Sequence, residues 1–370
     1  MTDEKKSILR QDIRTAISSA RDLVIETKAD IVLIPGDLFD YESLCSDTSA
    51  FLVELFGSIA PARVFITPGN HDSLRPGNPF LSMESTNWPG NVHIFTSPEF
   101  ETITIPELDC AVSGVAHAHR GITDRLISHP IESSNSATNI LLFHGSRDGY
   151  KPSEKENVIP FSDAELLMQG FTYTAIGHYH SFSSIADENG HIRAAYSGCL
   201  QGRGLDETGV KYALVGEIDS DGVVTLEKRE VAPRRIVNVE VDLTGAAEDA
   251  VVLNRIDAAL GSENVRECDI VNITLIGYAS LLLSLDFSEL ESVNRYFHVN
   301  INRSRIEPDY DLESMRKDSA ASSLKSEFVR RMLELQEQEL DPQKQQILRD
   351  ATYYGLYALD GRRLEPRDAN

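Results

Sequence analysis

The chain has 370 residues and a formal net charge of −23, with 41% hydrophobic and 25% charged residues. This composition is that of an ordinary globular protein with two or three domains. The acidic charge argues against a broad nucleic-acid-binding face, although divalent metals could supply positive charge locally at a nuclease site. No apolar run reaches the roughly 20 residues of a membrane span, and the first residues lack a signal-peptide core. The four cysteines have no CxxC spacing, so we expect reduced thiols in a cytoplasmic protein.

The first half of the chain alternates between helical and extended patterns. The apolar run at 31–34 is typical of a strand buried on both faces, whereas apolar residues between 7 and 28 recur at helical spacing. The expected elements, in chain order, are a helix at 7–28, a strand at 31–34, a helix at 46–58, strands at 63–67 and 140–143, a helix at 162–169 and a strand at 172–176. Strands that alternate with helices predict a layered α/β fold.

The second half begins with a different pattern. Gly and Asp turns separate three short strands, at 191–196, 211–217 and 223–226, which predict an antiparallel meander attached to the α/β core. Pro233-Arg234-Arg235 marks a junction. A strand from 236, a helix near 248–260 and a strand at 269–275 then indicate a small β-α-β unit.

The last part of the chain has helical periodicity. One expected helix carries an apolar face, and a second follows Asp341-Pro342, which is a good helix start. The apolar residues of the two helices are Leu324, Phe328, Met332 and Leu335, and then Ile347, Ala351, Tyr354 and Leu356. These helices could pack on their own chain or form a docking surface for a partner. We therefore divide the chain into residues 1–234, 235–305 and 306–370.

Polar side chains follow four of the apolar strands at the point where each strand ends. Each group stands within a residue or two of a glycine, which lets the backbone turn sharply and leaves room near a ligand. The residues are Asp37 in GDLFD, Asn70, His71 and Asp72 in GNHD, His144 in FHGS, and His178 and His180 in GHYH. Because ligands of α/β sheets bind at the carboxyl ends of the strands, these side chains could converge on one site.

Carboxylate, amide and imidazole groups suit Mn²⁺, Fe or Zn²⁺, and the lack of cysteine among them argues against a structural zinc cage. Such a set can hold two ions roughly 3.5–4 Å apart, the arrangement used for phosphoester hydrolysis. One bridging carboxylate suffices for a metal pair, and Asp37 is the natural candidate. The metals would activate a water and clamp the phosphate oxygens.

The order GDLFD, GNHD, His-Gly and GHYH resembles that of the calcineurin-like metallophosphoesterases. The resemblance implies a metallophosphoesterase β-sandwich flanked by helices over residues 1–234. It implies Asp37 as the bridging ligand, Asn70, His144 and His178 on one metal, and His180 on the other. His71 would face the scissile phosphate as a general acid. Asp72 would either orient His71 or serve the turn.

The segment from Ala195 to Gly209, with its YSG and Glu-Thr-Gly, is similar to one in the SbcD-type DNA repair exonucleases, and is closest to the YhaO-like branch. This resemblance implies two Mn²⁺ ions, DNA as the substrate and no membrane association. Residues 235–305 resemble the capping domain of that family. The tail, residues 306–370, would dock on an SMC-like ATPase of the SbcC or YhaN type, which could supply affinity for DNA. The family commonly forms homodimers.

One motif of the family is missing from this chain. The family begins with a strand ending in Asp-x-His, whereas this chain begins with MTDEKKSILRQDIRTAI and has no histidine before His71. Either the chain is truncated, or it is a natural variant with an impaired first metal site. We expect little or no nuclease activity from the chain as written. A metallophosphoesterase acting on a small phosphodiester or a phosphoprotein, or a catalytically impaired partner subunit, remain alternative interpretations.

Three further residues could belong to the site. His117 and His119 form another alternating pair, which could line the site or serve a loop or the core. Arg203 follows the YSG segment and could meet a phosphate or be a surface charge.

Overall fold

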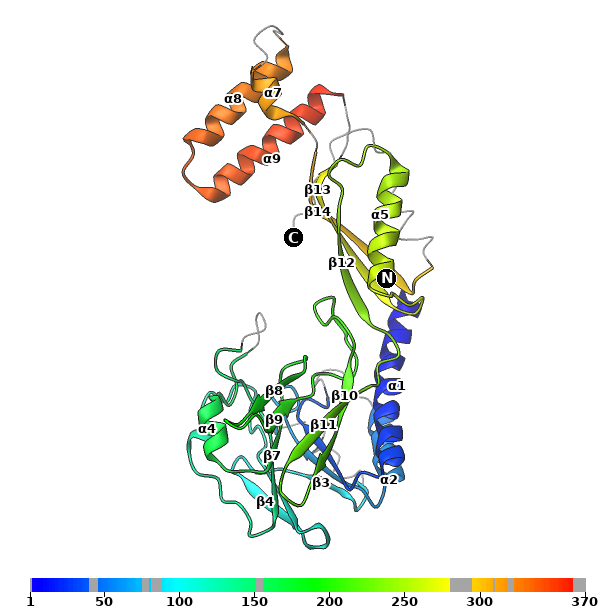
Figure 1. The fold of residues 1–370 in the computed structure, drawn as a ribbon, viewed down its shortest axis with the longest axis vertical. Helices are drawn as coiled ribbons and strands as arrows, with labels where there is room; N and C mark the ends of the chain where they lie inside the picture. The colour runs from blue at the N-terminus through cyan, green and yellow to red at the C-terminus, as the bar shows by residue number, and fades with distance from the viewer. Residues whose placement is uncertain are drawn as a thin grey trace. The chain divides into compact units, whose positions relative to one another are not determined.

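The computed structural model describes residues 2–39, 46–74, 80, 88–150, 156–279, 295–308, 310–317 and 323–361. The chain divides into two compact units, Met1–Arg235 and Ile236–Asn370. Each is described by itself (Figure 1). The division of the chain into three domains stays a prediction.

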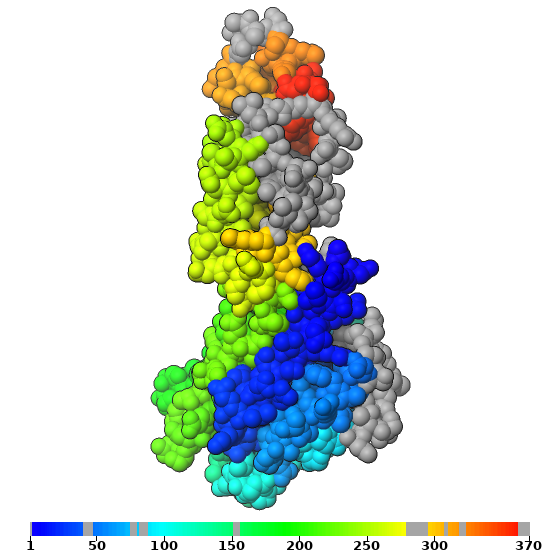
Figure 2. Space-filling model, turned by 90° about the vertical axis from the view of Figure 1, so that its right-hand side faces the viewer, coloured from blue at the N-terminus to red at the C-terminus, as the bar shows by residue number. Residues whose placement is uncertain are grey.

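The first unit begins with two helices beside a small parallel sheet. Helix α1 spans Asp3–Thr27 and α2 spans Ser46–Ser58. The sheet has the order β1-β2-β3, formed by Ile31–Pro35, Arg63–Thr67 and Val92–Ile94. Arg14 on α1 pairs with Asp47 on α2 at 2.5 Å, and Figure 2 shows dark blue α1 alongside the lighter blue α2.

A six-stranded sheet forms the other half of this unit, in the order β4-β5-β6-β7-β9-β8. Its strands are Glu101–Ile105, Cys110–Gly114, Thr138–His144, Tyr173–Gly177, Ile192–Tyr196 and Ser183–Ala186 in that order. Strands β5, β6, β7 and β9 run parallel, and the two edge strands run antiparallel to their neighbours. Helix α4, Asp163–Met168, starts with a capping box between Ser162 and Glu165.

Alternating side chains join these elements into layers. On β2, Phe65 packs into the core shared with the six-stranded sheet, whereas Ile66 packs with the α2 residues Leu52 and Phe56. On β6, Leu142 faces that shared core, and its neighbours in the chain belong to a further core under α4. The successive layers are helices α1 and α2, the three-stranded sheet, the six-stranded sheet and helix α4. The predicted layered α/β sandwich is therefore confirmed.

The predicted meander is only partly right. Strands β10, Tyr212–Ile218, and β11, Val224–Glu230, pair antiparallel as a two-stranded sheet. Strand β9 instead belongs to the six-stranded sheet, where it pairs in parallel with β7. The sequence pattern of β9 is that of any short strand, and long-range pairing with a buried neighbour decides its sheet.

The prediction that strand 31–34 is buried on both faces is also only partly right. All five residues of β1 are partly exposed. The strand lies at one end of its sheet in the described part of the chain, and it packs apolar residues on both faces, Leu33 toward the six-stranded sheet and Val32 toward the helices. An edge strand keeps some exposure even when both faces are covered.

The second unit combines a parallel sheet with helices. Strands β12, Ile236–Asp242, β13, Ile270–Ala279, and β14, His298–Pro308, pair in that order, and helix α5, Asp249–Ser262, connects β12 to β13. Its core includes Val239, Val252 and Ile273. A β-α-β crossover of this kind is what the sequence pattern predicts.

In the described residues after β14, the helices are α7 over Leu312–Lys317, α8 over Leu324–Gln338 and α9 over Pro342–Leu359. Asp341 caps α9 by accepting a hydrogen bond from the Gln343 amide. Helices α8 and α9 approach so closely that a Cβ on Gly355 would lie 2.1 Å from the Phe328 ring. None of the helices in the described ranges is both long and apolar enough to cross a membrane.

Candidate metal centre

The carboxyl ends of β1, β2, β6 and β7 meet in the first unit. A Cβ on Gly177, at the end of β7, would lie 1.7 Å from the Pro35 carbonyl oxygen, at the end of β1. Gly36 has a φ of +84°, and a Cβ there would lie 2.6 Å from His144 Nδ1. The glycines beside the polar motifs therefore let backbone and imidazole approach more closely than any other residue would allow.

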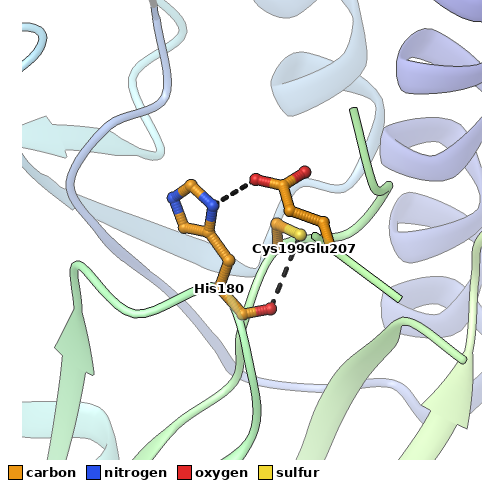
Figure 3. A group of neighbouring side chains, drawn as sticks. All are labelled: His180, Cys199 and Glu207. Atoms are coloured by element: carbon orange, nitrogen blue, oxygen red, sulfur yellow. Dashed lines mark hydrogen bonds and ion pairs between the residues drawn. The ribbon is translucent and has the colours of Figure 1, made fainter. Parts of the chain in front are cut away.

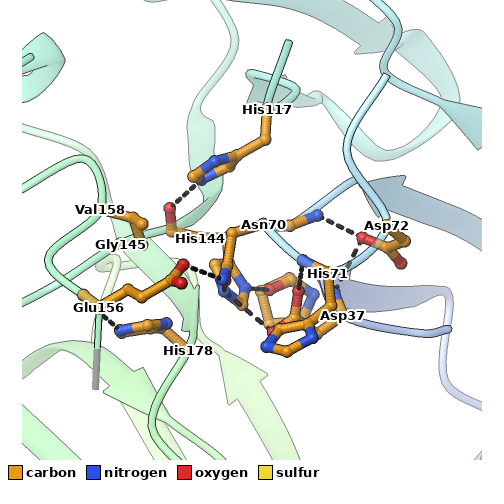
Figure 4. Close-up of polar contacts among 12 residues, drawn as sticks. Asp37, Asn70, His71, Asp72, His117, His144, Gly145, Glu156, Val158 and His178 are labelled. Atoms are coloured by element: carbon orange, nitrogen blue, oxygen red, sulfur yellow. Dashed lines mark hydrogen bonds and ion pairs between the residues drawn. The ribbon is translucent and has the colours of Figure 1, made fainter. Parts of the chain in front are cut away.

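Asp37, Asn70 and His144 form the centre of this cluster (Figure 4). His144 Nδ1–H donates to the Pro35 carbonyl at 2.9 Å, which leaves Nε2 facing the other two side chains. Nε2 lies 2.9 Å from Asn70 Oδ1 and 3.3 Å from Asp37 Oδ2. Three ligand atoms that share one cation lie about 3 Å apart, because each bond is about 2.1 Å. The donor set therefore fits a divalent metal ion.

The charges in the cluster depend on one another. Burial by itself would raise the pKa of Asp37, but the His144 charge and hydrogen bonds from His144 and the His71 amide lower it below its usual range. Burial alone would lower the pKa of His144, and the Asp37 carboxylate raises it instead. The Asp37 carboxylate therefore favours positive charge at this position, which a metal ion would supply.

His71 and Asp72 lie on the same turn but make different hydrogen bonds. The His71 amide donates to Asp37 Oδ1 at 2.9 Å. The Asp72 carboxylate accepts backbone N–H bonds from Gly69, Asp37, Leu38 and Phe39, at 2.6–3.2 Å. Burial and the nearby Asp37 charge raise the pKa of Asp72 to about 7. These contacts favour the turn role for Asp72, because its carboxylate joins the Asp37 loop to the Gly69 turn.

His178 lies beside the cluster, with its ring 5.2 Å from the His144 ring. Its φ of +109° is strained for a residue with a side chain, as is common at functional sites. His178 Nε2–H donates to the Glu156 carbonyl at 2.8 Å. Glu156 also accepts from Asn70 Nδ2 at 3.3 Å, so it helps turn the Asn70 oxygen toward His144. Glu156 was not predicted as a site residue, because it belongs to no recognisable motif.

His117 supports the cluster from behind. It is fully buried, its Nε2–H donates to the His144 carbonyl at 2.8 Å, and burial lowers its pKa to about 4. His117 therefore holds the end of β6 as a neutral imidazole. Of the two residues of this alternating pair, it is the one that the structure brings to the back of the cluster.

His180 belongs to a second group of side chains, with Cys199 and Glu207 (Figure 3). His180 Nδ1–H donates to the Glu207 carboxylate. Arg203 lies in the same loop with an exposed side chain, and its amide donates to Glu207 at 2.6 Å. The pKa of Glu207 falls to about 2, because the hydrogen bonds from His180 and the Arg203 amide outweigh its burial.

Comparison with known proteins shows what the first unit is similar to. Residues 9–182 match the model of the calcineurin-like phosphoesterase family. The Bacillus subtilis (strain 168) protein "Uncharacterized metallophosphoesterase YhaO" is 29% identical over 206 residues, which cover 54% of this chain and 48% of that protein. The chain spans about half the length of this curated relative.

Both matches are to phosphoesterases, and the relative is named a metallophosphoesterase. The assignment to DNA repair exonucleases and the role of each site residue stay predictions.

Proposed function

We propose that this chain is a metal-dependent phosphodiesterase that acts on DNA, as a subunit of a repair exonuclease with two Mn²⁺ ions. The observation that carries the proposal is the cluster at the strand ends, where His144 Nε2 lies within 3.3 Å of oxygens of both Asn70 and Asp37. Asp37 would bridge the ions, with His178 completing one ligand set and His180 belonging to the other.

When bound, the ions would supply Lewis acidity to phosphate oxygens and lower the pKa of a water. The protein's own residues would position the ligands, donate a proton and bind the phosphate. The His144–Pro35 hydrogen bond fixes the imidazole so that Nε2 faces the ligand position. The His71–Asp37 hydrogen bond ties the His71 backbone to the cluster, and we propose that the imidazole protonates the leaving oxygen. Arg203 would meet a phosphate with its exposed guanidinium.

We further propose that helices α7, α8 and α9 dock on an SMC-like ATPase in the cytoplasm. Support comes from large apolar side chains that are exposed in this part of the chain, with Leu324 on α8 at 71%, Ile347 on α9 at 66% and Leu340, between the two helices, at 92%. Such a partner would provide the DNA affinity that a chain of net charge −23 does not favour. Homodimer formation belongs to the same proposal.

The test compares Mn²⁺ binding and hydrolysis of bis-p-nitrophenyl phosphate and linear duplex DNA, with and without an SMC-like ATPase. We expect Asp37→Asn and Asn70→Ala to weaken Mn²⁺ binding at least tenfold. Turnover should be slow, because the sequence holds no Asp-x-His, and it should fall at least tenfold in His71→Ala.

Unchanged Mn²⁺ binding in both cluster variants would overturn the proposed site. Hydrolysis of the small ester alone, in the presence of the ATPase, would favour a small phosphodiester as the substrate. Robust DNA degradation by the chain alone would contradict the expected slow turnover.

A further inference from the structure

The loop that follows β5 leads from the back of the strand-end cluster to the protein surface. β5 runs parallel to β6, so its carboxyl end lies at the same edge of the six-stranded sheet as His144. His117 is fully buried behind His144, whereas the side chain of Arg120, on the same loop, is 52% exposed. A guanidinium group therefore stands at the surface, on a loop whose first part supports the cluster.

Backbone hydrogen bonds fix this loop on two sides. The His117 amide donates to the Pro68 carbonyl at 3.2 Å, and the His117 carbonyl accepts from the Leu74 amide at 2.8 Å, which ties the loop to the GNHD turn. Further along, the Ile159 amide donates to the Ile122 carbonyl at 2.7 Å, which ties the loop to the segment before α4. The backbone on either side of the arginine is therefore held in place.

Glu156 connects the Arg120 side chain to the cluster. Arg120 Nε lies 3.3 Å from Glu156 Oε1 and 3.4 Å from Oε2. The same Oε2 accepts from Asn70 Nδ2 at 3.3 Å, and Figure 4 shows Glu156 beside both Asn70 and His178. One carboxylate oxygen thus lies between the guanidinium and the amide of a predicted metal ligand.

This contact occupies one of the three guanidinium nitrogens. The hydrogen bond is made by Nε, and neither terminal nitrogen of Arg120 donates a hydrogen bond to any residue that the structure describes. The two terminal nitrogens of a guanidinium match two oxygens of a phosphate. Because an exposed ion pair contributes little to stability, Arg120 can also shift toward an anion at little cost in free energy.

A phosphate that approaches the cluster meets negative charge from the protein. Asp37 and Glu156 carry carboxylates in the cluster and beside it, and the whole chain has a net charge of −23. Bound metal ions would offset this charge, and a fixed cation next to them stabilises a phosphate further. Arg120 supplies such a cation, which the Asp, Asn and His residues of the four motifs do not.

We propose that Arg120 binds a phosphate of the substrate, with its two terminal nitrogens on two phosphate oxygens while Glu156 holds Nε. This inference rests on the proposed function, in which the cluster binds the metal ions and the ester, and it adds a substrate-binding residue from outside the four motifs. The phosphate that is hydrolysed and its neighbour in a nucleic-acid strand offer the same oxygens, and the experiment distinguishes them.

Equilibrium binding of TpT, which has one phosphate, and TpTpT, which has two, to the full chain in the presence of Mn²⁺ tests this residue. We expect Arg120→Gln to weaken TpTpT binding about tenfold, because charged hydrogen bonds to the phosphate are lost. Arg120→Lys keeps the charge without the planar fork and should bind with intermediate affinity. An equal loss for both ligands assigns Arg120 to the phosphate that is hydrolysed, and a loss for TpTpT alone assigns it to the neighbouring phosphate.

Arg63→Gln is the matched control. The Arg63 side chain is 46% exposed and pairs with Glu107 at 2.7 Å, but it lies at the start of β2, whereas the cluster lies at the other end of that strand. Both variants lose one positive charge, so a purely long-range effect would weaken binding to a similar extent. Equal affinities of Arg120→Gln and Arg63→Gln for both ligands would overturn the proposal.

Mn²⁺ binding separates this inference from the proposed function. Arg120→Gln should bind Mn²⁺ at least as tightly as the wild type and keep its unfolding midpoint, because the side chain is exposed and ligates no ion in the proposal. Weaker Mn²⁺ binding together with a lower midpoint would indicate a structural role and overturn the inference alone. A wild type that binds neither Mn²⁺ nor either oligonucleotide would overturn the proposed function as well.

Discussion

The strand-end cluster and the His180 group contain similar side chains but are held in different ways. In the cluster, Asn70 is 2% and His144 is 1% exposed, and four strand ends meet so closely that glycine is required between them. The His180 group lies on loops, is partly exposed, and depends on hydrogen bonds to the His180 carbonyl and the Glu207 carboxylate. Close backbone packing therefore makes the cluster rigid, whereas the His180 group is held by hydrogen bonds on loops and its side chains can adjust.

The largest effect should come from the backbone of the cluster. Gly177→Ala would place a Cβ 1.7 Å from the Pro35 oxygen, so β1 and β7 would have to move apart. We expect the free energy of unfolding to fall by about 4 kcal/mol or more, measured by urea denaturation. Gly121→Ala is the control, since a Cβ there meets nothing within 4 Å. Equal stability of the two variants would contradict the tight convergence of the strand ends.

The next largest effect should come from removing the carboxylate that accepts backbone hydrogen bonds in each group, which is Asp72 in the cluster and Glu207 in the His180 group. Asp72→Ala removes the acceptor of four buried or partly buried backbone amides and should cost about 3 kcal/mol of stability. Glu207→Ala removes the acceptor of the Arg203 amide and of His180, and should cost about 1 kcal/mol. Both values come from denaturant unfolding. A larger loss of unfolding free energy in the Glu207 variant would mean that the loop contact stabilises the fold more than the strand-end turn does.

The rates of thiol labelling at pH 7.5 should report how accessible Cys199 in the His180 group is, relative to an exposed cysteine and a buried one. Cys268 is exposed and should react fastest. Burial raises the pKa of Cys199, which should react more slowly. Burial raises the pKa of Cys110 to about 11, so its labelling should need unfolding of the first unit. Mass spectrometry of labelled peptides gives the three rates, and rapid labelling of Cys110 in the folded chain would be at odds with its place on β5.

The smallest effect should come from a surface ion pair outside both groups. Hydrogen bonds from Arg125 and the Ser162 amide lower the pKa of Glu165 to about 2, from a usual value of 4.5. Because the folded pKa is lowered, the stabilisation is present above about pH 4.5 and is lost as the pH falls toward 2. Glu165→Gln should lower stability by under about 1 kcal/mol at pH 7 and by clearly less at pH 2, where about half of the carboxylate is protonated. An unfolding series at both pH values measures the difference.

The local sequence was enough to predict most elements of the first unit. Apolar periodicity located α1, α2, β1, β2, β6 and β7 within a few residues, because each pattern spans one continuous segment. The glycine-flanked polar motifs also predicted that Asp37, Asn70 and His144 would meet, because carboxyl ends of neighbouring parallel strands share one edge. Strands β3, β4 and β8 were missed, since short or half-exposed strands carry a weak signal. Strand β5 is fully buried, but its sequence, CAVSG, has small and polar residues in place of a continuous large apolar run.

Only the tertiary structure decided which side chains stand beside these motifs. Glu156 meets Asn70 across 86 residues, and Glu207 meets His180 across 27, so neither contact follows from local spacing. The same holds for β9, which was expected in the meander but pairs with β7 in the six-stranded sheet. The sequence by itself determined the strand ends and their chemistry. Long-range packing determined the neighbours, because it depends on how distant segments bury their surfaces together and not on any local pattern.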